Sequence, residues 1–303
     1  MDAQVSRTSV LLERIRLPWA GWNRESYLGM ALARLIHRHA AIIGLAVLGI
    51  LVAGAAFAPF IAPYDPLQAD PEAAFSAPNL AHLFGTDYIG RDVFSQILYG
   101  GRISLQVGFI SVGIGAFFGV ILGLVAGFYG HHLDSIIMRL MDVLLAFPGI
   151  LLAMVIVAVL GTNLTNLMVA VGISLIPVYA RLVRATVLSE KENLYVEAAR
   201  VVGCPDARIM LKHILPNVVA PVIVLSTQGL GRAIIAAAAL SYLGLGAQPP
   251  TPEWGALASG GRNYLRNAWW ISTFPGLVIL VAVVAINLVG DGLRDALDPR
   301  LKI

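Results

Sequence analysis

Charged side chains are scarce in this chain of 303 residues. Asp, Glu, Lys and Arg make up 13% of it, whereas 58% of the residues are hydrophobic. A soluble protein carries about 25% charged residues, which keep its surface in water. The uncharged stretches here are as long as a lipid bilayer is thick. The composition therefore excludes an ordinary soluble domain and predicts an all-α integral membrane protein.

Cysteine and lysine are almost absent, which excludes several kinds of site. Cys204 is the single cysteine, so the chain has neither an intrachain disulfide nor a cysteine-built metal site. None of the three lysines follows a glycine, which excludes a Gly-Lys phosphate-binding loop. The His-Glu-x-x-His zinc motif and the Gly-x-Ser-x-Gly nucleophile turn are also missing. We therefore expect a chain that catalyses no reaction and binds no metal or cofactor.

Six apolar segments are long enough to cross a membrane. Crossing a hydrocarbon core of about 30 Å takes roughly 20 residues of helix. The uncharged run from 143 to 180 suffices for two spans, and the polar turn 161–166 divides it. The predicted spans are 39–60, 103–130, 143–160, the stretch from 167 to beyond 181, 218–241 and 269–290.

The basic residues orient these spans, because Lys and Arg near span ends tend to stay in the cytoplasm. With both termini cytoplasmic, the inner segments hold sixteen basic residues and the outer segments four. Basic residues that serve orientation do not indicate nucleic acid, and we expect no such partner. The chain then divides into a cytoplasmic N-terminal segment (1–38), the first span, an extracytoplasmic segment (61–102), a core transmembrane domain (103–291) and a cytoplasmic tail (292–303).

Glycine recurs at every fourth position of the second span. The positions are Gly115, Gly119, Gly123 and Gly127. Because four residues are close to one helical turn, the span carries a ridge without side chains, which another helix can approach closely. The ridge packs either against a helix of this chain or against a partner subunit.

The fifth span contains two candidate functional residues, Arg232 and Gln228. A permanent charge within a span is costly, so Arg232 should face the bundle interior, an aqueous cavity or a partner. Two interpretations stay open for this pair. Arg232 either pairs with carbonyl groups or a carboxylate, as within a subunit contact, or lines a pathway for a transported solute.

The longest internal cytoplasmic segment, 188–217, reads as two short helices around a break. Gly203 is placed to end the first helix, and Pro205 to start the second. Such an exposed knob is too short to be a domain, yet it has the right size to insert into a cleft of another protein. An ordinary connecting loop is the alternative.

Four motifs give the chain a family resemblance. Glu197-Ala198-Ala199, Gly203 and Leu215-Pro216 resemble the Glu-Ala-Ala…Gly…Leu-Pro signature of ABC importer permeases. Further motifs at 84–94, 241–255 and 288–300 resemble the C-type permease subunit of dipeptide, oligopeptide and nickel importers. The resemblance runs from about residue 35 to the end and implies the six-helix type I importer fold. In that family the signature forms the coupling helix, which implies a coupling role for Tyr195, Glu197, Ala198, Ala199, Gly203, Leu215 and Pro216.

The resemblance also implies a set of partners. A B-type permease subunit would complete the pathway through a bacterial or archaeal cell membrane, in contact with lipid. Two ABC ATPase subunits would hold ATP and Mg, and an extracytoplasmic peptide-binding protein would deliver the substrate. Peptides are the expected substrate, with nickel or another small solute as the alternative. A membrane-embedded enzyme and a passive channel are alternatives of other classes.

The outer segments offer a surface on which a binding protein could dock. The segment 61–102 contains four prolines in its first half and forms a stiff, extended connection rather than a span. It would share the docking surface with the loop 244–268. Four acidic residues in the first of these segments predict an acidic face, namely Asp70, Glu72, Asp87 and Asp92.

Overall fold

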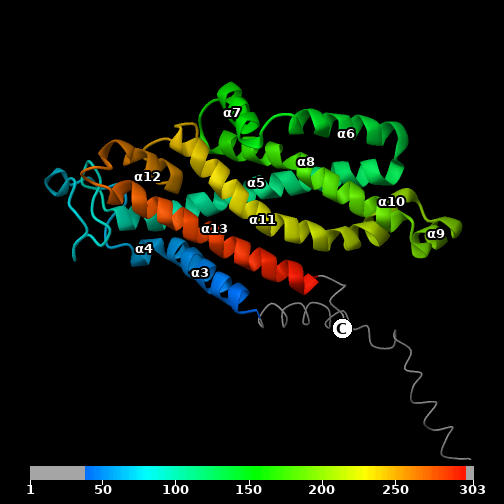
Figure 1. The fold of residues 1–303 in the computed structure, drawn as a ribbon, viewed down its shortest axis with the longest axis horizontal. Coiled ribbons are helices and arrows are strands. Elements are labelled where there is room, and N and C mark those ends of the chain that lie inside the picture. The colour runs from blue at the N-terminus through cyan, green and yellow to red at the C-terminus, as the bar shows by residue number, and fades with distance from the viewer. Residues whose placement is uncertain (1–37, 298–303) are drawn as a thin grey trace, which may run out of the picture.

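The computed structural model describes residues 38–297, and the predictions made for 1–37 and 298–303 lie outside the described residues. Five long helices run side by side along the long axis of the molecule (Figure 1). In the described range the regular structure is helical, with one isolated bridge between Thr86 and Asp92. The all-α prediction is confirmed. The long helices are α3 (His39–Ala56), α5 (Val93–Tyr129), α8 (Leu164–Lys191), α11 (Leu215–Tyr242) and α13 (Trp270–Leu297).

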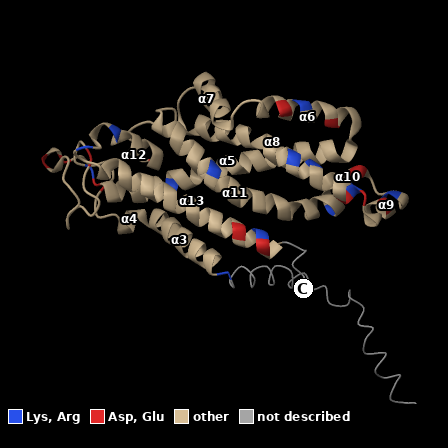
Figure 2. Ribbon diagram, in the orientation of Figure 1, with Lys and Arg blue, Asp and Glu red and all other residues tan. Residues whose placement is uncertain are grey.

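Short elements connect the long helices at the two ends of the bundle. One end carries the segment before α5 together with α12, and the other carries α9 and α10 (Figure 1). Charged residues concentrate at these ends, and few lie along the middle of the bundle (Figure 2). The short elements are α4 (Ala58–Ile61), η1 (Pro71–Ala73), α9 (Leu194–Val201), α10 (Asp206–Arg208), η2 (Ile209–Ile214), α12 (Trp254–Gly260) and η3 (Arg262–Tyr264).

The region expected to form the third crossing is a bent pair of helices. Helix α6 (His131–Leu145) and helix α7 (Gly149–Leu160) meet at an angle of 89°. Pro148 lies at the break, where it has no N–H to continue the α6 hydrogen-bond ladder. The span expected over 143–160 is therefore interrupted at this proline, and its helical part after the break is α7. The described residues hold five helices long and apolar enough to cross a membrane, or six if the bent pair is one span.

The start of the second span and the end of the first span differ from the predicted positions. Helix α5 begins at Val93, ten residues before the predicted start of the second span at 103, because the buried Asp92 side chain caps it. The Oδ2 atom of Asp92 accepts a hydrogen bond from the Ser95 amide at 2.8 Å, which satisfies an N–H that a helix start leaves free. The extracytoplasmic segment 61–102 therefore ends in a helix. The first span ends at Ala56, and the short helix α4 follows it.

The glycine ridge of α5 packs against α8 of the same chain. All four glycines are buried, and a Cβ on Gly123 would lie 2.5 Å from the Ala180 carbonyl oxygen. A Cβ on Gly127 would lie 2.8 Å from Cβ of Val187. Gly172 of α8 faces back toward α5, because a Cβ there would come within 2.7 Å of Cβ of Ile114. The ridge is thus occupied within this chain, which is the first of the two alternatives.

Helix α3 is fastened to its neighbours at both ends. At the outer end, Arg102 of α5 donates from Nε to the Ala55 carbonyl at 2.6 Å and from Nη2 to the Ala56 carbonyl at 2.7 Å. These are terminal carbonyls that no residue of α3 itself can satisfy. At the other end, Arg38 and Asp295 of α13 form an ion pair of 2.9 Å. Helix α3 therefore belongs to one bundle with α5 and α13.

Candidate functional site: the cytoplasmic coupling segment

Helix α9 protrudes from the end of the bundle (Figure 1). Its inner face is held by Val196 and Ala199, which are buried against Val187 of α8 and Ile209 of the following turn. Its outer face leaves large apolar side chains in solvent, with Leu194 82% and Val201 85% exposed. Helix α9 is therefore anchored on one side and free on the other, as a docking knob needs to be.

The helix ends in the manner that the sequence predicts. Gly203 has a φ of +77°, in the left-handed region that favours glycine. Its amide donates to the Arg200 carbonyl at 2.9 Å, and the Cys204 amide donates to the Ala199 carbonyl at 3.0 Å. A Cβ on Gly203 would meet no atom within 4 Å. Glycine is therefore favoured here by the left-handed backbone conformation and not by a lack of space for a side chain.

The second half of the segment leads directly into the membrane. Helix α10 begins at Asp206 after Pro205, and the chain stays helical through a π-helical turn, η2, into α11. Pro216 lies in the first turn of α11 and has no N–H to give to the preceding turn, which is consistent with the wider π-helical geometry there. A continuous helical path thus runs from Asp206, just after the break that follows α9, to Tyr242.

One carboxylate connects three helices beneath the knob. Oε2 of Glu190, at the end of α8, accepts hydrogen bonds from the Tyr195 hydroxyl at 2.5 Å, from Asn193 Nδ2 at 3.0 Å and from Asn217 Nδ2 at 3.1 Å. Asn217, on α11, also donates to the Tyr195 hydroxyl oxygen at 2.8 Å. We call Glu190, Tyr195 and Asn217 the clamp. Burial, followed by the neighbouring Glu190, raises the pKa of the Tyr195 hydroxyl.

The clamp was only partly found from the sequence. Tyr195 was predicted as a coupling residue, whereas Glu190 and Asn217 were not. These two residues are 27 positions apart, and no periodic pattern relates them. A further contact fastens α9 to the end of α5, because the Arg200 guanidinium lies 5.4 Å from the centre of the Phe128 ring. The knob is therefore braced against α5, α8 and α11.

The other predicted coupling residues fall on both sides of α9. Glu197 and Ala198 are exposed, and the Glu197 side chain makes no hydrogen bond or ion pair with any residue in the range 38–297. It therefore does not cap its own helix there. Ala199 is buried, Leu215 is half-buried, and Pro216 is exposed at the start of α11. The accessible face of α9 is thus a carboxylate and a small alanine between exposed apolar side chains.

Arg232 and Gln228 lie one turn apart near the middle of α11. Arg232 is exposed and Gln228 half-buried. Within the part of the chain that the structure describes, Arg232 makes no ion pair or hydrogen bond. Pairing with another described residue of this chain is therefore not seen, and both pairing across a subunit contact and a place on the pathway stay open. Its charge faces outward from the bundle, toward whatever covers this side of α11.

Two of the four acidic residues expected on the outer face are buried, so the prediction is wrong for Asp87 and Asp92. Asp87 and Asp92 are each only 2% exposed. Asp87 is bonded to Arg91 at 2.7 Å, and Asp92 contacts His82 Nδ1 at 3.0 Å while it caps α5. Their charges hold the segment before α5 together and do not reach solvent. Of the four acidic residues expected to form this face, Asp70 and Glu72 are exposed.

Metal-ligating residues do not gather anywhere in the described range. No group of three or more His, Cys, Asp or Glu side chains within residues 38–297 is placed to hold a metal ion. The segments with functional geometry are therefore the coupling segment at one end and the outer loops at the other.

The sequence matches two families of known proteins. Residues 119–303 match the family described as binding-protein-dependent transport system inner membrane component. Residues 26–78 match the N-terminal TM domain of oligopeptide transport permease C. The first match covers more than half of the chain and includes the coupling segment, α11 and α13.

Curated relatives are similar over most of their length. A dipeptide transport system permease protein, DppC, of Alkalihalophilus pseudofirmus is 47% identical over 262 residues, which are 86% of this chain and 86% of the relative. A di/tripeptide transport system permease protein of Pseudomonas aeruginosa is 47% identical over 88% of this chain and 90% of its own. A glutathione transport system permease protein, GsiD, of Pectobacterium atrosepticum is 47% identical over 95% of this chain and 93% of its own.

A solved structure shares the fold. A chain of the MetNI methionine ABC transporter, in an inward-facing conformation, superposes with a TM-score of 0.55 at 19% identity, covering 67% of this chain and 96% of that one. At this identity the likeness concerns the fold alone, which is that of a type I importer permease. The two family matches and this shared fold agree with each other. The chain belongs to the family of binding-protein-dependent transport system inner membrane components, as a multi-pass permease subunit of an ABC importer.

Proposed function

We propose that this chain is the C-type permease subunit of a peptide importer in a bacterial or archaeal cell membrane. It would form the pathway together with a B-type permease subunit and receive peptides from an extracytoplasmic binding protein. Two separate ABC ATPase subunits would hold ATP and Mg, and this chain would bind no cofactor and catalyse no reaction. The names of the relatives support the substrate class, since they specify dipeptides, di/tripeptides and glutathione, itself a tripeptide.

The observation that carries the proposal is the one-sided exposure of α9. Leu194 and Val201 stand in the aqueous phase, and Glu197 between them has no partner in the described part of the chain. Apolar side chains grouped around an unpaired charge on a protruding helix are typical of an interaction site. A cleft on the ATPase with apolar walls and one basic group would satisfy all three residues. We infer that Glu197 serves docking rather than capping.

The clamp explains how a push on α9 would reach the membrane. Glu190 fixes α9 to the end of α8 and to the start of α11, so displacing the knob displaces both helices. Arg200 and Phe128 add the end of α5. Rigid helices that shift as a group are one of the known ways to alternate between two packed arrangements. Uptake would then follow the ATPase cycle.

Arg232 and Gln228 would move with α11. Because Arg232 is exposed and unpaired in the described structure, we propose that it faces either the second permease or the aqueous pathway, with Gln228 one turn away. Either place would supply the polar surroundings that a guanidinium requires at this depth.

Cross-linking offers a direct test with a matched control. The single natural cysteine, Cys204, is first replaced by serine, and one cysteine is placed at Ala198 or at Ala199 in the full complex. Ala198 is exposed and Ala199 is 7% exposed, so a short thiol cross-linker should join Ala198→Cys to the ATPase and leave Ala199→Cys unreacted. Failure of Ala198→Cys to trap the ATPase in a complex that takes up peptide would contradict the proposal.

A transport measurement complements the cross-link. Gly203→Trp forces a bulky residue into a left-handed turn and enlarges the knob. In proteoliposomes with the full complex, we expect assembly with the ATPase to fall, or ATP to be hydrolysed without peptide uptake. Unchanged ATP-dependent uptake would count against the coupling role of this segment.

A further inference from the structure

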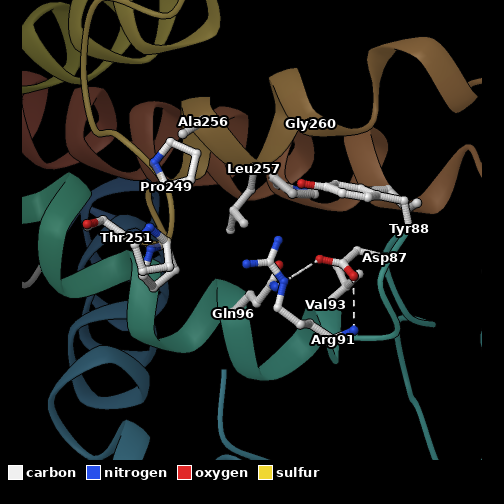
Figure 3. A pocket seen from close by; sticks show the side chains of 14 residues that line it. Asp87, Tyr88, Arg91, Val93, Gln96, Pro249, Thr251, Ala256, Leu257 and Gly260 are labelled. Carbon is white, nitrogen blue, oxygen red and sulfur yellow. Dashed lines mark hydrogen bonds and ion pairs between the residues drawn. The ribbon is translucent and has the colours of Figure 1, made fainter. Parts of the chain in front are cut away.

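A small cavity lies at the outer end of the bundle, beside the start of α5. Figure 3 shows it between α5, α12 and the proline-containing loop that precedes α12. Its volume is about 100 Å³. The floor contains Asp87, Gln96 and Val93, all buried, and the rim contains the exposed Tyr88 and Gly260. The cavity thus combines a buried polar floor with an accessible mouth.

The two charged groups in the floor are not equivalent. Each oxygen of Asp87 already accepts two hydrogen bonds: Oδ1 from the amides of Ile89 and Arg91 at 3.0 and 2.9 Å, and Oδ2 from Arg91 Nε at 2.7 Å and Gln96 Nε2 at 3.1 Å. Arg91 uses only Nε of its guanidinium in this network. The carboxylate is therefore saturated, and the arginine retains its two terminal amino groups.

These amino groups point into the cavity. In Figure 3 the terminal nitrogens of Arg91 are directed away from Asp87, toward the space below Leu257 and beside Thr251. The Arg91 side chain is 14% exposed, so a group that binds it is largely shielded from water. Two parallel N–H groups of a guanidinium match the two oxygens of a carboxylate. The unused amino groups of Arg91 are therefore donors that a carboxylate is shaped to accept from.

The size of the cavity limits how large a group bearing the carboxylate can enter it. For comparison, an engineered cavity of about 150 Å³ binds benzene. The space here is smaller, and prolines 249, 250 and 252 line it together with Leu257. A carboxylate on a short methylene stem fits these dimensions, whereas a whole peptide does not. The ligand is accordingly a side chain that projects from a larger body outside.

We propose that this cavity receives an acidic side chain of the extracytoplasmic binding protein when that protein docks. The proposal rests on the proposed function, which supplies the binding protein and places this end of the bundle outside. The donors of the cavity favour this occupant: Asp87 is buried and its oxygens are already used, whereas the terminal amino groups of Arg91 face the cavity. An acidic anchor in a desolvated arginine pocket would fix the register of the complex.

Gly260 provides a test that leaves the Asp87–Arg91 pair untouched. A Cβ on Gly260 would meet only Cε1 of Tyr88, at 3.9 Å, so alanine fits at the mouth and leucine fills it. Peptide uptake by the reconstituted full complex is measured against the concentration of peptide-loaded binding protein. We expect Gly260→Leu to raise the half-saturating concentration of the binding protein about tenfold and to leave the maximal uptake rate unchanged. Gly260→Ala should shift the half-saturating concentration less than twofold.

Arg91→Lys supplies the second measurement, because lysine keeps the charge and loses the fork. We expect a similar rise, with the salt dependence of the half-saturating concentration close to that of the unmodified complex because the charge is kept. Arg266→Gln, which removes a charge from an exposed position of the same face outside this cavity, serves as its control. If the Arg91→Lys complex fails to assemble, the comparison of Gly260→Leu with Gly260→Ala tests the proposal by itself.

Three results would overturn the proposal. These are an unchanged half-saturating concentration in Gly260→Leu, an equal rise in Gly260→Ala and Gly260→Leu, or a loss of maximal rate in Gly260→Leu with no change in half-saturation. Each of them leaves the proposed function standing, since uptake would still require ATP and the binding protein. If the proposed function itself were wrong, uptake would instead proceed without ATP or without the binding protein.

Discussion

The Tyr195 hydroxyl donates a hydrogen bond of 2.5 Å to Oε2 of Glu190, across the break between the last turn of α8 and the protruding helix α9. Asn217 approaches the same oxygen from α11 at 3.1 Å. A single carboxylate therefore holds the knob in a fixed orientation relative to two membrane helices. Hydrogen bonds to a charged acceptor are roughly twice as strong as those between neutral groups, which suits a joint that transmits force.

Removing this carboxylate should uncouple ATP hydrolysis from uptake. Glu190→Ala leaves the donors on Tyr195, Asn193 and Asn217 without their common acceptor. We expect peptide uptake to fall about tenfold, corresponding to roughly 1.4 kcal/mol, while the complex still hydrolyses ATP. The measurement is the number of ATP molecules hydrolysed per peptide taken up in proteoliposomes.

Glu192 supplies the matched control for that experiment. It is an exposed glutamate two positions away, and the described structure gives its side chain no hydrogen bond or ion pair. Glu192→Ala should keep the ratio of ATP to peptide at the level of the unmodified complex. A ratio that changes equally in both variants would show that charge in this region matters, rather than the clamp.

The clamp should be insensitive to pH over the physiological range. The pKa of Tyr195 is raised above its ordinary value of 10.0, first by burial and then by Glu190. A phenol with a raised pKa contributes stability that is fully present below its unfolded pKa and is lost only as the pH rises through the folded value. Tyr195→Phe should therefore reduce uptake by the same factor at pH 7 and pH 9. A factor that shrinks between pH 7 and pH 9 would mean that the hydroxyl already ionises in this interval.

Helix α5 should tolerate a methyl group at a glycine that lies off the ridge and not at a glycine of the ridge. A Cβ on Gly123 would lie 2.5 Å from the Ala180 carbonyl oxygen, whereas a Cβ on Gly113 would meet no atom within 4 Å. Because the obstacle is backbone, Gly123→Ala must separate α5 from α8, and overpacking of this kind costs about 1–3 kcal/mol. Thermal unfolding of the purified complex should occur at a lower temperature for Gly123→Ala. Gly113→Ala should not lower the unfolding temperature, and equal loss in both would contradict the packing role.

The sequence predicts features that depend on local composition or on a repeat. Uncharged length alone locates the long helices, and four-residue spacing locates the ridge from Gly115 to Gly127. Gly203 and Pro205 predict the break after α9, because their backbone preferences act locally. Each of these signals is contained in a short window of sequence.

Features made by residues far apart in the chain could not be predicted in this way. Pro148 signals an interruption, yet the 89° angle between α6 and α7 depends on how each helix packs against the rest of the bundle. Asp87 and Asp92 read as surface charges, and only the folded outer segment buries them against Arg91 and His82. Contacts that join residues across turns and helices depend on tertiary structure.

Two ion pairs join α6 to α8, and the more buried one should contribute more to stability. Arg184 binds Asp134 through both Nε and Nη2, the latter at 2.6 Å, and their side chains are 33% and 18% exposed. Arg181 meets Asp142 through one nitrogen, with exposures of 53% and 60%. Water screens the second pair more strongly, and exposed pairs contribute at most about 1 kcal/mol. Double-mutant cycles that replace the carboxylates by Asn and the arginines by Gln, read out by thermal unfolding, should give about 1 kcal/mol for Asp134–Arg184 and a few tenths for Asp142–Arg181. Equal coupling energies would mean that the bidentate geometry and the lower exposure of Asp134–Arg184 add nothing to stability.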